Sequence, residues 1–211
     1  MIEIELRFAI ESVPVALTEL TPTKEKSQID IYYDTPDYAL LRRGAFLRIR
    51  NGSRVDFKAD LSCGEVQHDY CNEMNFDLAT ISQKSDEINK LLNVLGIHAA
   101  GKYNDFDDYV KQNELQVLAM IDKNRREYKI TNNLTIALDD AKNMGLFIEA
   151  EITVPDNTEK EEIQKYIAEM RGVLSERGIL QSDVEPINVG YVELYLMQHN
   201  RKAYDLGLYK E

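Results

Sequence analysis

The sequence predicts an α+β fold built on a mainly antiparallel sheet. Segments that alternate apolar and polar residues come in groups, and helical segments separate these groups instead of following each strand. Several strands alternate apolar with charged residues, which places the two kinds on opposite faces of the sheet. At 211 residues, of which 44% are hydrophobic, the chain is long enough to bury a core.

The first predicted strand, residues 2–8, alternates charged residues with Ile, Leu and Phe, and a short helix is expected near residues 14–20. The second strand, residues 28–33, ends at Asp34-Thr35-Pro36-Asp37, which breaks a strand and can cap a helical turn. The later strands are expected at residues 69–77, 119–130, 133–139 and 145–153.

Apolar residues at helical spacing predict helices at residues 85–95 and 157–177, and each is closed by a glycine. Residues 105–118 and 191–200 are also interpreted as helices. This order of strands and helices is typical of α+β proteins, not of alternating strand–helix units.

A hairpin is predicted over residues 46–60, FLRIRNGSRVDFKAD, around Asn51-Gly52. A three-residue loop pairs Arg50 with Arg54 and Arg48 with Asp56. Leu47, Ile49, Val55 and Phe57 then share one face and the charged residues the other, whereas a two-residue loop mixes charged and apolar groups. The segregated pattern favours the longer loop.

Charged residues alternate with apolar residues on many of these strands. The acids are Glu3, Glu5, Glu73, Asp139, Glu149 and Glu151, and the bases are Arg7, Arg48, Arg50, Lys58, Lys123 and Arg125. One interpretation is a sheet with a solvated charged face. The other is a barrel of about eight strands whose wet interior holds a divalent cation at the carboxylates and a polyanion at the bases. Carboxylates suit Mg²⁺ or Mn²⁺, and Arg and Lys suit phosphoryl oxygens.

A net charge of −12 argues against general nucleic-acid binding and against binding to anionic membranes. No apolar run approaches the length of a membrane span, and the N-terminus lacks the pattern of a signal peptide. Two cysteines suit a reducing compartment. We therefore expect a cytoplasmic protein that does not bind membranes, and a homodimer is left open.

Four blocks of the sequence, in order, resemble the CYTH superfamily, the triphosphate tunnel metalloenzymes. The N-terminal ExExK motif of that family resembles IEIELRF, and its next block resembles YYDTPDYALLRRGAFLRIR. Its later basic strand is similar to IDKNRREY, and its block with an aspartate before ExE is similar to ALDDAKNMGLFIEAEI. The blocks run from residue 1 to about 153, and GYVELYL is similar to the closing segment of the family.

The resemblance implies one domain over residues 1–211, a closed antiparallel β-barrel tunnel with helices packed outside and a helical insertion near residues 98–118. It implies that the six acids named above bind Mg²⁺ or Mn²⁺ and that the six bases bind a triphosphate. It also implies catalytic roles for Glu5 and for Arg7, which stands where the family has the ExExK lysine.

The resemblance further implies a metal-dependent hydrolase of a small-molecule triphosphate: inorganic tripolyphosphate, thiamine triphosphate or a nucleoside triphosphate. A class IV adenylyl cyclase and a polyphosphate-binding module without turnover are the alternatives. Two departures bear on this choice. Arg7 places a planar, forked guanidinium where the family has the compact ammonium of a lysine. Cys71 and Asn75 flank Glu73 where the family often has Arg-x-Glu-x-Glu.

Overall fold

The computed structural model describes residues 2–60, 71–97, 101–155 and 158–208, and it gives the backbone alone at positions 2, 3, 60, 71–73 and 160. The strands are β1 (Ile2–Ile10), β2 (Lys24–Asp34), β3 (Ala45–Arg50), β4 (Arg54–Asp60), β5 (Cys71–Asp77), β6 (Gln116–Lys129), β7 (Leu134–Ala141) and β8 (Gly145–Val154).

The helices are α1 (Val15–Thr18), α2 (Ser85–Val94), α3 (Phe106–Gln112), α4 (Lys160–Glu176), α5 (Tyr191–His199) and α6 (Arg201–Tyr204), with 3₁₀ helices η1 (Leu41–Arg43) and η3 (Leu78–Lys84). None of these helices combines the length and the hydropathy that crossing a membrane requires.

The strands form one eight-stranded antiparallel sheet in the order β1-β8-β7-β6-β2-β3-β4-β5. The predicted α+β class and antiparallel sheet are therefore confirmed. The order is linear, with β1 and β5 at its two ends, and no ladder among the described strands joins these two. The closed barrel is thus not confirmed.

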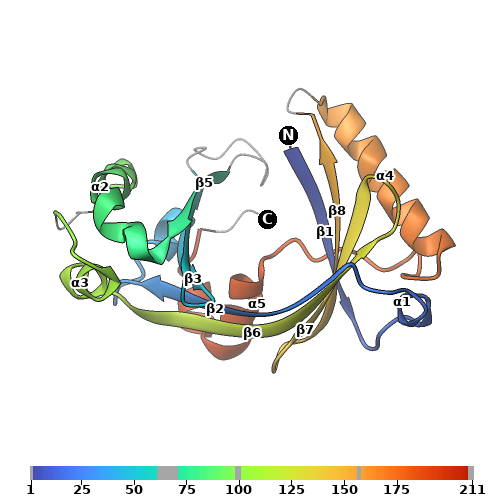
Figure 1. Cartoon of the computed structure of the whole chain (residues 1–211), viewed down its shortest axis with the longest axis horizontal. Coiled ribbons are helices and arrows are strands. Elements are labelled where there is room, and N and C mark those ends of the chain that lie inside the picture. The colour runs from blue at the N-terminus through green and yellow to red at the C-terminus, as the bar shows by residue number, and fades with distance from the viewer. Residues whose placement is uncertain (1, 61–70, 98–100, 156–157, 209–211) are drawn as a thin grey trace. The chain divides into compact units, whose positions relative to one another are not determined.

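The chain divides into two compact units, of which unit 1 comprises Met1–Gln28 and Asp122–Val189. In this unit α4 lies alongside β1 and β8 (Figure 1). One face of the strands contributes Phe8, Ile136 and Ile148 to a buried core, and α4 contributes Met170 and Leu174. The apolar stripe of α4 therefore covers one face of the strands in unit 1.

Unit 2 comprises Ile29–Ile121 and Gly190–Glu211. Its core joins Leu47 of β3 and Phe57 of β4 to Ile88 and Leu92 of α2 and Tyr109 of α3. As in unit 1, helices cover the apolar face of the strands, so that charged side chains alternate onto the other face.

The hairpin has the predicted register. Arg50 pairs with Arg54, Arg48 with Asp56, and Phe46 with Lys58. Asn51 and Gly52 have φ values of 51° and 63°, a left-handed conformation that Asn and Gly adopt readily. The Asn51 side chain also accepts a hydrogen bond of 2.8 Å from the backbone N–H of Ile29. The loop is therefore held against β2.

The predicted helix over residues 105–118 is wrong after Gln112. Helix α3 ends there, Glu114 takes a left-handed conformation with φ 53°, and β6 begins at Gln116. Burial alternates along the new strand, with Ala119 and Ile121 buried and Met120 exposed. This two-residue period belongs to a strand. The helical part of the proposed insertion is therefore α3, and residues 98–100 lie outside the described residues.

Asp34 closes β2 and holds the turn that follows, as its place in the sequence predicts. Its buried carboxylate accepts backbone hydrogen bonds from Thr35 (2.7 Å), Leu40 (2.9 Å) and Leu41 (2.9 Å). Burial raises the pKa of Asp34, and the three N–H donors oppose this rise. One side chain thus ties the end of β2 to the start of η1.

We expect Asp34→Ala to lower the free energy of unfolding by about 2–4 kcal/mol, because it leaves buried N–H groups of Leu40 and Leu41 unpaired. Urea denaturation followed by circular dichroism measures the loss. Asp37→Ala, at an exposed position of the same turn, is the control and should cost less than about 1 kcal/mol. Equal losses in the two variants would contradict this role of Asp34.

Candidate functional site

In unit 1, charged side chains occupy the strand face opposite the α4 core. The strand register pairs Arg7 with Glu149, Glu5 with Glu151 and Arg125 with Asp139. We call the following residues the unit 1 charged cluster: Glu5, Arg7, Lys123, Arg125, Asp139 and Glu149. They come from β1, β6, β7 and β8, so the sheet brings together residues that are far apart in the sequence.

Arg7 bridges two carboxylates of this cluster. Its Nε donates to Glu149 Oε1 at 2.8 Å, and its Nη2 lies 2.6 Å from the same oxygen. Nη2 also donates to Glu5 Oε1 at 2.7 Å, while Nη1 donates to the backbone carbonyl of Val189 at 2.7 Å. The planar fork of the guanidinium thus serves three partners at once.

Asp139 forms the second centre of the cluster and has no exposed surface. Its carboxylate accepts from Lys123 Nζ at 2.6 Å and from Arg125 Nε and Nη2 at 2.7 and 2.5 Å. Arg125 also donates to Glu149. Arg125 therefore links the two buried carboxylates.

Burial disfavours the charged form of each group in this cluster. The neighbouring charges and hydrogen bonds decide whether its pKa ends above or below the ordinary value. For Asp139, burial raises the pKa, but hydrogen bonds and charge from Arg125 and Lys123 lower it below its ordinary value. For Glu149, burial is likewise outweighed by the charges of Arg7, Arg125 and Lys123, and the pKa is lowered. Stability from these ionised carboxylates is therefore present at neutral pH and is lost as the pH falls through their folded pKa values.

Lys123 shows the opposite balance. Burial lowers the pKa of this ammonium, and the nearby Asp139 and Glu149 carboxylates only partly offset it. The cluster thus combines carboxylates that readily ionise with a lysine that gives up its proton more easily than usual.

In unit 2, three arginines and two buried aspartates alternate along a continuous row, the unit 2 charged cluster. Asp30 accepts from Arg50 Nε at 2.8 Å and from Arg48 Nη1 at 3.4 Å. Asp56 accepts from Arg48 Nη2 at 2.7 Å and from Arg54 Nε at 2.6 Å. Strands β2, β3 and β4 supply this row, in which three guanidinium groups face two carboxylates.

The structure brings many of the predicted site residues into these clusters, and their assigned roles stay predictions. Glu151 lies opposite Glu5 in the register, and Lys58 lies opposite Glu73. Glu3 pairs with Thr153 through the backbone, and the side chains of Glu3 and Glu73 lie outside the described residues.

Asp30 is a member of the unit 2 charged cluster that the sequence reasoning missed. A signal was present, because Gln28, Asp30 and Tyr32 alternate with Ile29 and Ile31 on the second predicted strand. The same alternation rule that selected the other acids places Asp30 on the polar face.

A divalent cation would need oxygen ligands, and the unit 1 charged cluster supplies ligands of that type. Glu5 and Glu151 lie directly opposite each other on β1 and β8, where like charges destabilise a sheet unless a cation lies near. In the described part of the chain, no group of three His, Cys, Asp or Glu side chains gathers as a metal site. Arg7 pairs with both Glu5 and Glu149.

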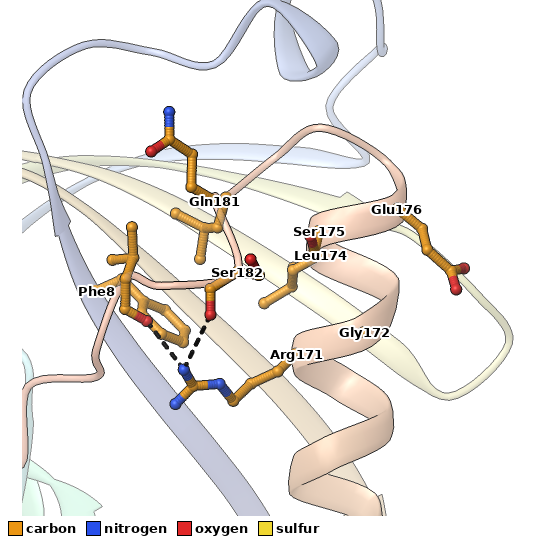
Figure 2. A pocket seen from close by; sticks show the side chains of 10 residues that line it. Phe8, Arg171, Gly172, Leu174, Ser175, Glu176, Gln181 and Ser182 are labelled. Atoms are coloured by element: carbon orange, nitrogen blue, oxygen red, sulfur yellow. Dashed lines mark hydrogen bonds between the residues drawn. The ribbon is translucent and has the colours of Figure 1, made fainter.

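A separate pocket of about 260 Å³ in unit 1 lies between α4 and the segment that follows it. Figure 2 shows Arg171 pointing toward Ser182, whose carbonyl it contacts at 3.4 Å. Arg171 also pairs with Glu185 at 3.0 Å. No predicted site residue lines this pocket, so it is distinct from the charged cluster.

Comparison with known proteins relates this architecture to one family. A family model of the CYTH domain matches residues 1–182. The search of curated protein sequences gave no match.

Several solved structures share the fold. The PH1819 protein of Pyrococcus horikoshii OT3 is 22% identical with a TM-score of 0.58, over 93% of this chain and 99% of that one. HpAC1 of Hippeastrum is 20% identical with a TM-score of 0.60, over 93% of this chain and 95% of that one. A Bacillus halodurans protein named as a candidate adenylate cyclase is 16% identical with a TM-score of 0.57, over 94% and 97%.

Identities this low support the fold alone, whereas the family model spans most of the chain. The match also includes all the strands that carry the two charged clusters. This chain therefore belongs to the CYTH domain family.

Proposed function

We propose that the protein is a divalent-metal-dependent hydrolase of a small-molecule triphosphate. The observation that carries the proposal is the unit 2 charged cluster, in which two buried aspartates hold three arginines on one strand face. A row of guanidinium groups in excess of its carboxylates suits a polyanion. The family and one neighbour add support, since HpAC1 of Hippeastrum is described as having a dominant triphosphatase activity.

Binding of the triphosphate is assigned to arginine and lysine side chains of the strands. Arg48 and Arg50 are held by Asp30, and Arg50 keeps 27% of its side-chain surface exposed. Forked hydrogen bonds from such arginines match phosphoryl oxygens. Lys58, Lys123 and Arg125 are the further proposed contacts to phosphate.

The carboxylates of unit 1 are assigned to the cation. Glu3, Glu5, Glu149 and Glu151 would hold Mg²⁺ or Mn²⁺, with Glu73 and Asp139 as further acids. A bound divalent cation neutralises phosphoryl charge and lowers the pKa of water. Glu5 and Arg7 are the proposed catalytic residues, and their mutual contact of 2.7 Å fixes the position of both side chains.

A class IV adenylyl cyclase is the second candidate, because solved neighbours from Bacillus halodurans and Vibrio parahaemolyticus are named as candidate adenylate cyclases. Cyclisation of ATP would release pyrophosphate, whereas hydrolysis would release phosphate. A polyphosphate-binding module without turnover is the third candidate. The closed barrel, the single domain, the homodimer and the cytoplasmic location stay predictions.

A substrate screen tests the proposal directly. Tripolyphosphate, thiamine triphosphate and ATP are each incubated with Mg²⁺ or Mn²⁺, and phosphate, pyrophosphate and cyclic AMP are measured. We expect phosphate release, and we expect Glu149→Gln to lower kcat about 100-fold or more, because it removes a carboxylate from the cation site.

Glu169→Gln, at an exposed position of α4, is the matched control and should leave turnover unchanged. Cyclic AMP as the main product would support the cyclase. Turnover that survives in Glu149→Gln would contradict the assignment of the cation site.

We expect Arg50→Gln to raise KM for the triphosphate about tenfold, because one charge-assisted contact to the polyanion is lost. Arg48 still pairs with Asp30 in this variant, so the buried carboxylate keeps a partner. Steady-state kinetics give KM and kcat separately. Arg201→Gln, which removes an exposed ion pair on α6, is the control. An unchanged KM in Arg50→Gln would exclude Arg50 from the binding site.

A further inference from the structure

Arg7 is held on both its backbone and its side chain by groups of unit 1. The backbone carbonyl of Arg7 accepts from the N–H of Ile187 at 2.6 Å, and Nη1 donates to the carbonyl of Val189 at 2.7 Å. The other two nitrogens contact Glu5 and Glu149 at 2.7 and 2.8 Å. Three partners therefore fix the guanidinium between the two carboxylates, and a fourth contact holds the backbone.

We propose that Arg7 is a resident cation of the unit 1 charged cluster and that it competes with a divalent metal ion for Glu5 and Glu149. The inference rests on the proposed function for the assignment of these two glutamates as cation ligands. It adds that the chain carries a built-in competitor that weakens metal binding in the absence of substrate.

Charge balance supports the competition. Glu149 is 5% exposed and has both Arg7 and Arg125 as partners, so its buried charge is already compensated. A divalent ion beside Glu149 would lie within a few ångströms of two guanidinium groups. Like charges at that distance repel strongly at low dielectric. Metal binding to Glu149 therefore requires one of these two guanidinium groups to move, and Arg7 is the one that also pairs with the second proposed ligand, Glu5.

The contact with Val189 makes this movement costly. An arginine that swung away from Glu149 would also lose the hydrogen bond to a carbonyl that belongs to another segment. The arrangement that can bind metal is the one in which Arg7 has moved away from Glu149. If the protein adopts it only a fraction of the time, the apparent metal affinity falls by that fraction. The ammonium of a lysine is a compact point charge without this planar fork. A lysine at position 7 would therefore hold its place less firmly.

The test is a titration of Mn²⁺ into the protein without any triphosphate, with free Mn²⁺ measured by electron paramagnetic resonance. The proteins are wild type, Arg7→Gln, Arg7→Lys and the exposed control Arg201→Gln. We expect the Kd for Mn²⁺ to fall about tenfold in Arg7→Gln and about threefold in Arg7→Lys, and to stay unchanged in the control. Thermal melting adds a second readout, since Mn²⁺ should raise Tm more in Arg7→Gln than in wild type.

A double variant shows whether the gain in Mn²⁺ affinity depends on Glu149. Arg7→Gln combined with Glu149→Gln should lose the extra Mn²⁺ affinity, because the gain requires the Glu149 carboxylate. A double variant that keeps the gain would overturn the inference. Circular dichroism checks that each variant is folded. If Arg7→Gln does not fold, the comparison of Arg7→Lys with wild type tests the inference.

The outcomes separate the two proposals. If wild type, Arg7→Gln and Arg7→Lys bind Mn²⁺ with the same affinity and the variant without Glu149 binds it more weakly, the competition by Arg7 is wrong and the metal site stands. If no protein binds Mn²⁺, both the metal site and the competition are overturned.

Discussion

Four buried carboxylates on the charged face of the sheet are each paired with a cation, and the arrangement of the strands follows from this pairing. Glu149, Asp139, Asp30 and Asp56 are all buried, and each contacts at least one guanidinium group. An unmatched buried carboxylate would cost several kcal/mol, on the order of a whole domain's marginal stability. The register therefore has to place acids opposite bases.

The apolar face demands the same register. A slip of one residue would turn Phe8 and Ile148 away from α4 and would separate Arg7 from Glu149. The pairing of Arg48 with Asp56 in the hairpin of unit 2 carries the same double constraint. Two independent requirements thus specify one arrangement of strands, which explains how so many charges are tolerated away from water.

Sequence patterns predicted the strand faces because alternation is a local property. At Asn51-Gly52 the segregation of charged from apolar residues was enough to choose the three-residue loop, which pairs Arg50 with Arg54. The helix expected over residues 105–118 was wrong beyond Gln112, since a short apolar run fits either period until its tertiary partners are known. Contacts such as Arg7 with Val189, which join residues 182 positions apart, carry no local signal at all.

A crystal structure with Mn²⁺ would decide whether the unit 1 carboxylates form a cation site for which Arg7 competes. Anomalous scattering from manganese would locate the ion without reference to the protein. We expect a peak coordinated by the Glu149 carboxylate, with the Arg7 guanidinium moved away from its present contacts with Glu5 and Glu149. A manganese peak away from Glu5, Glu149 and Glu151, with Arg7 in place, would contradict it.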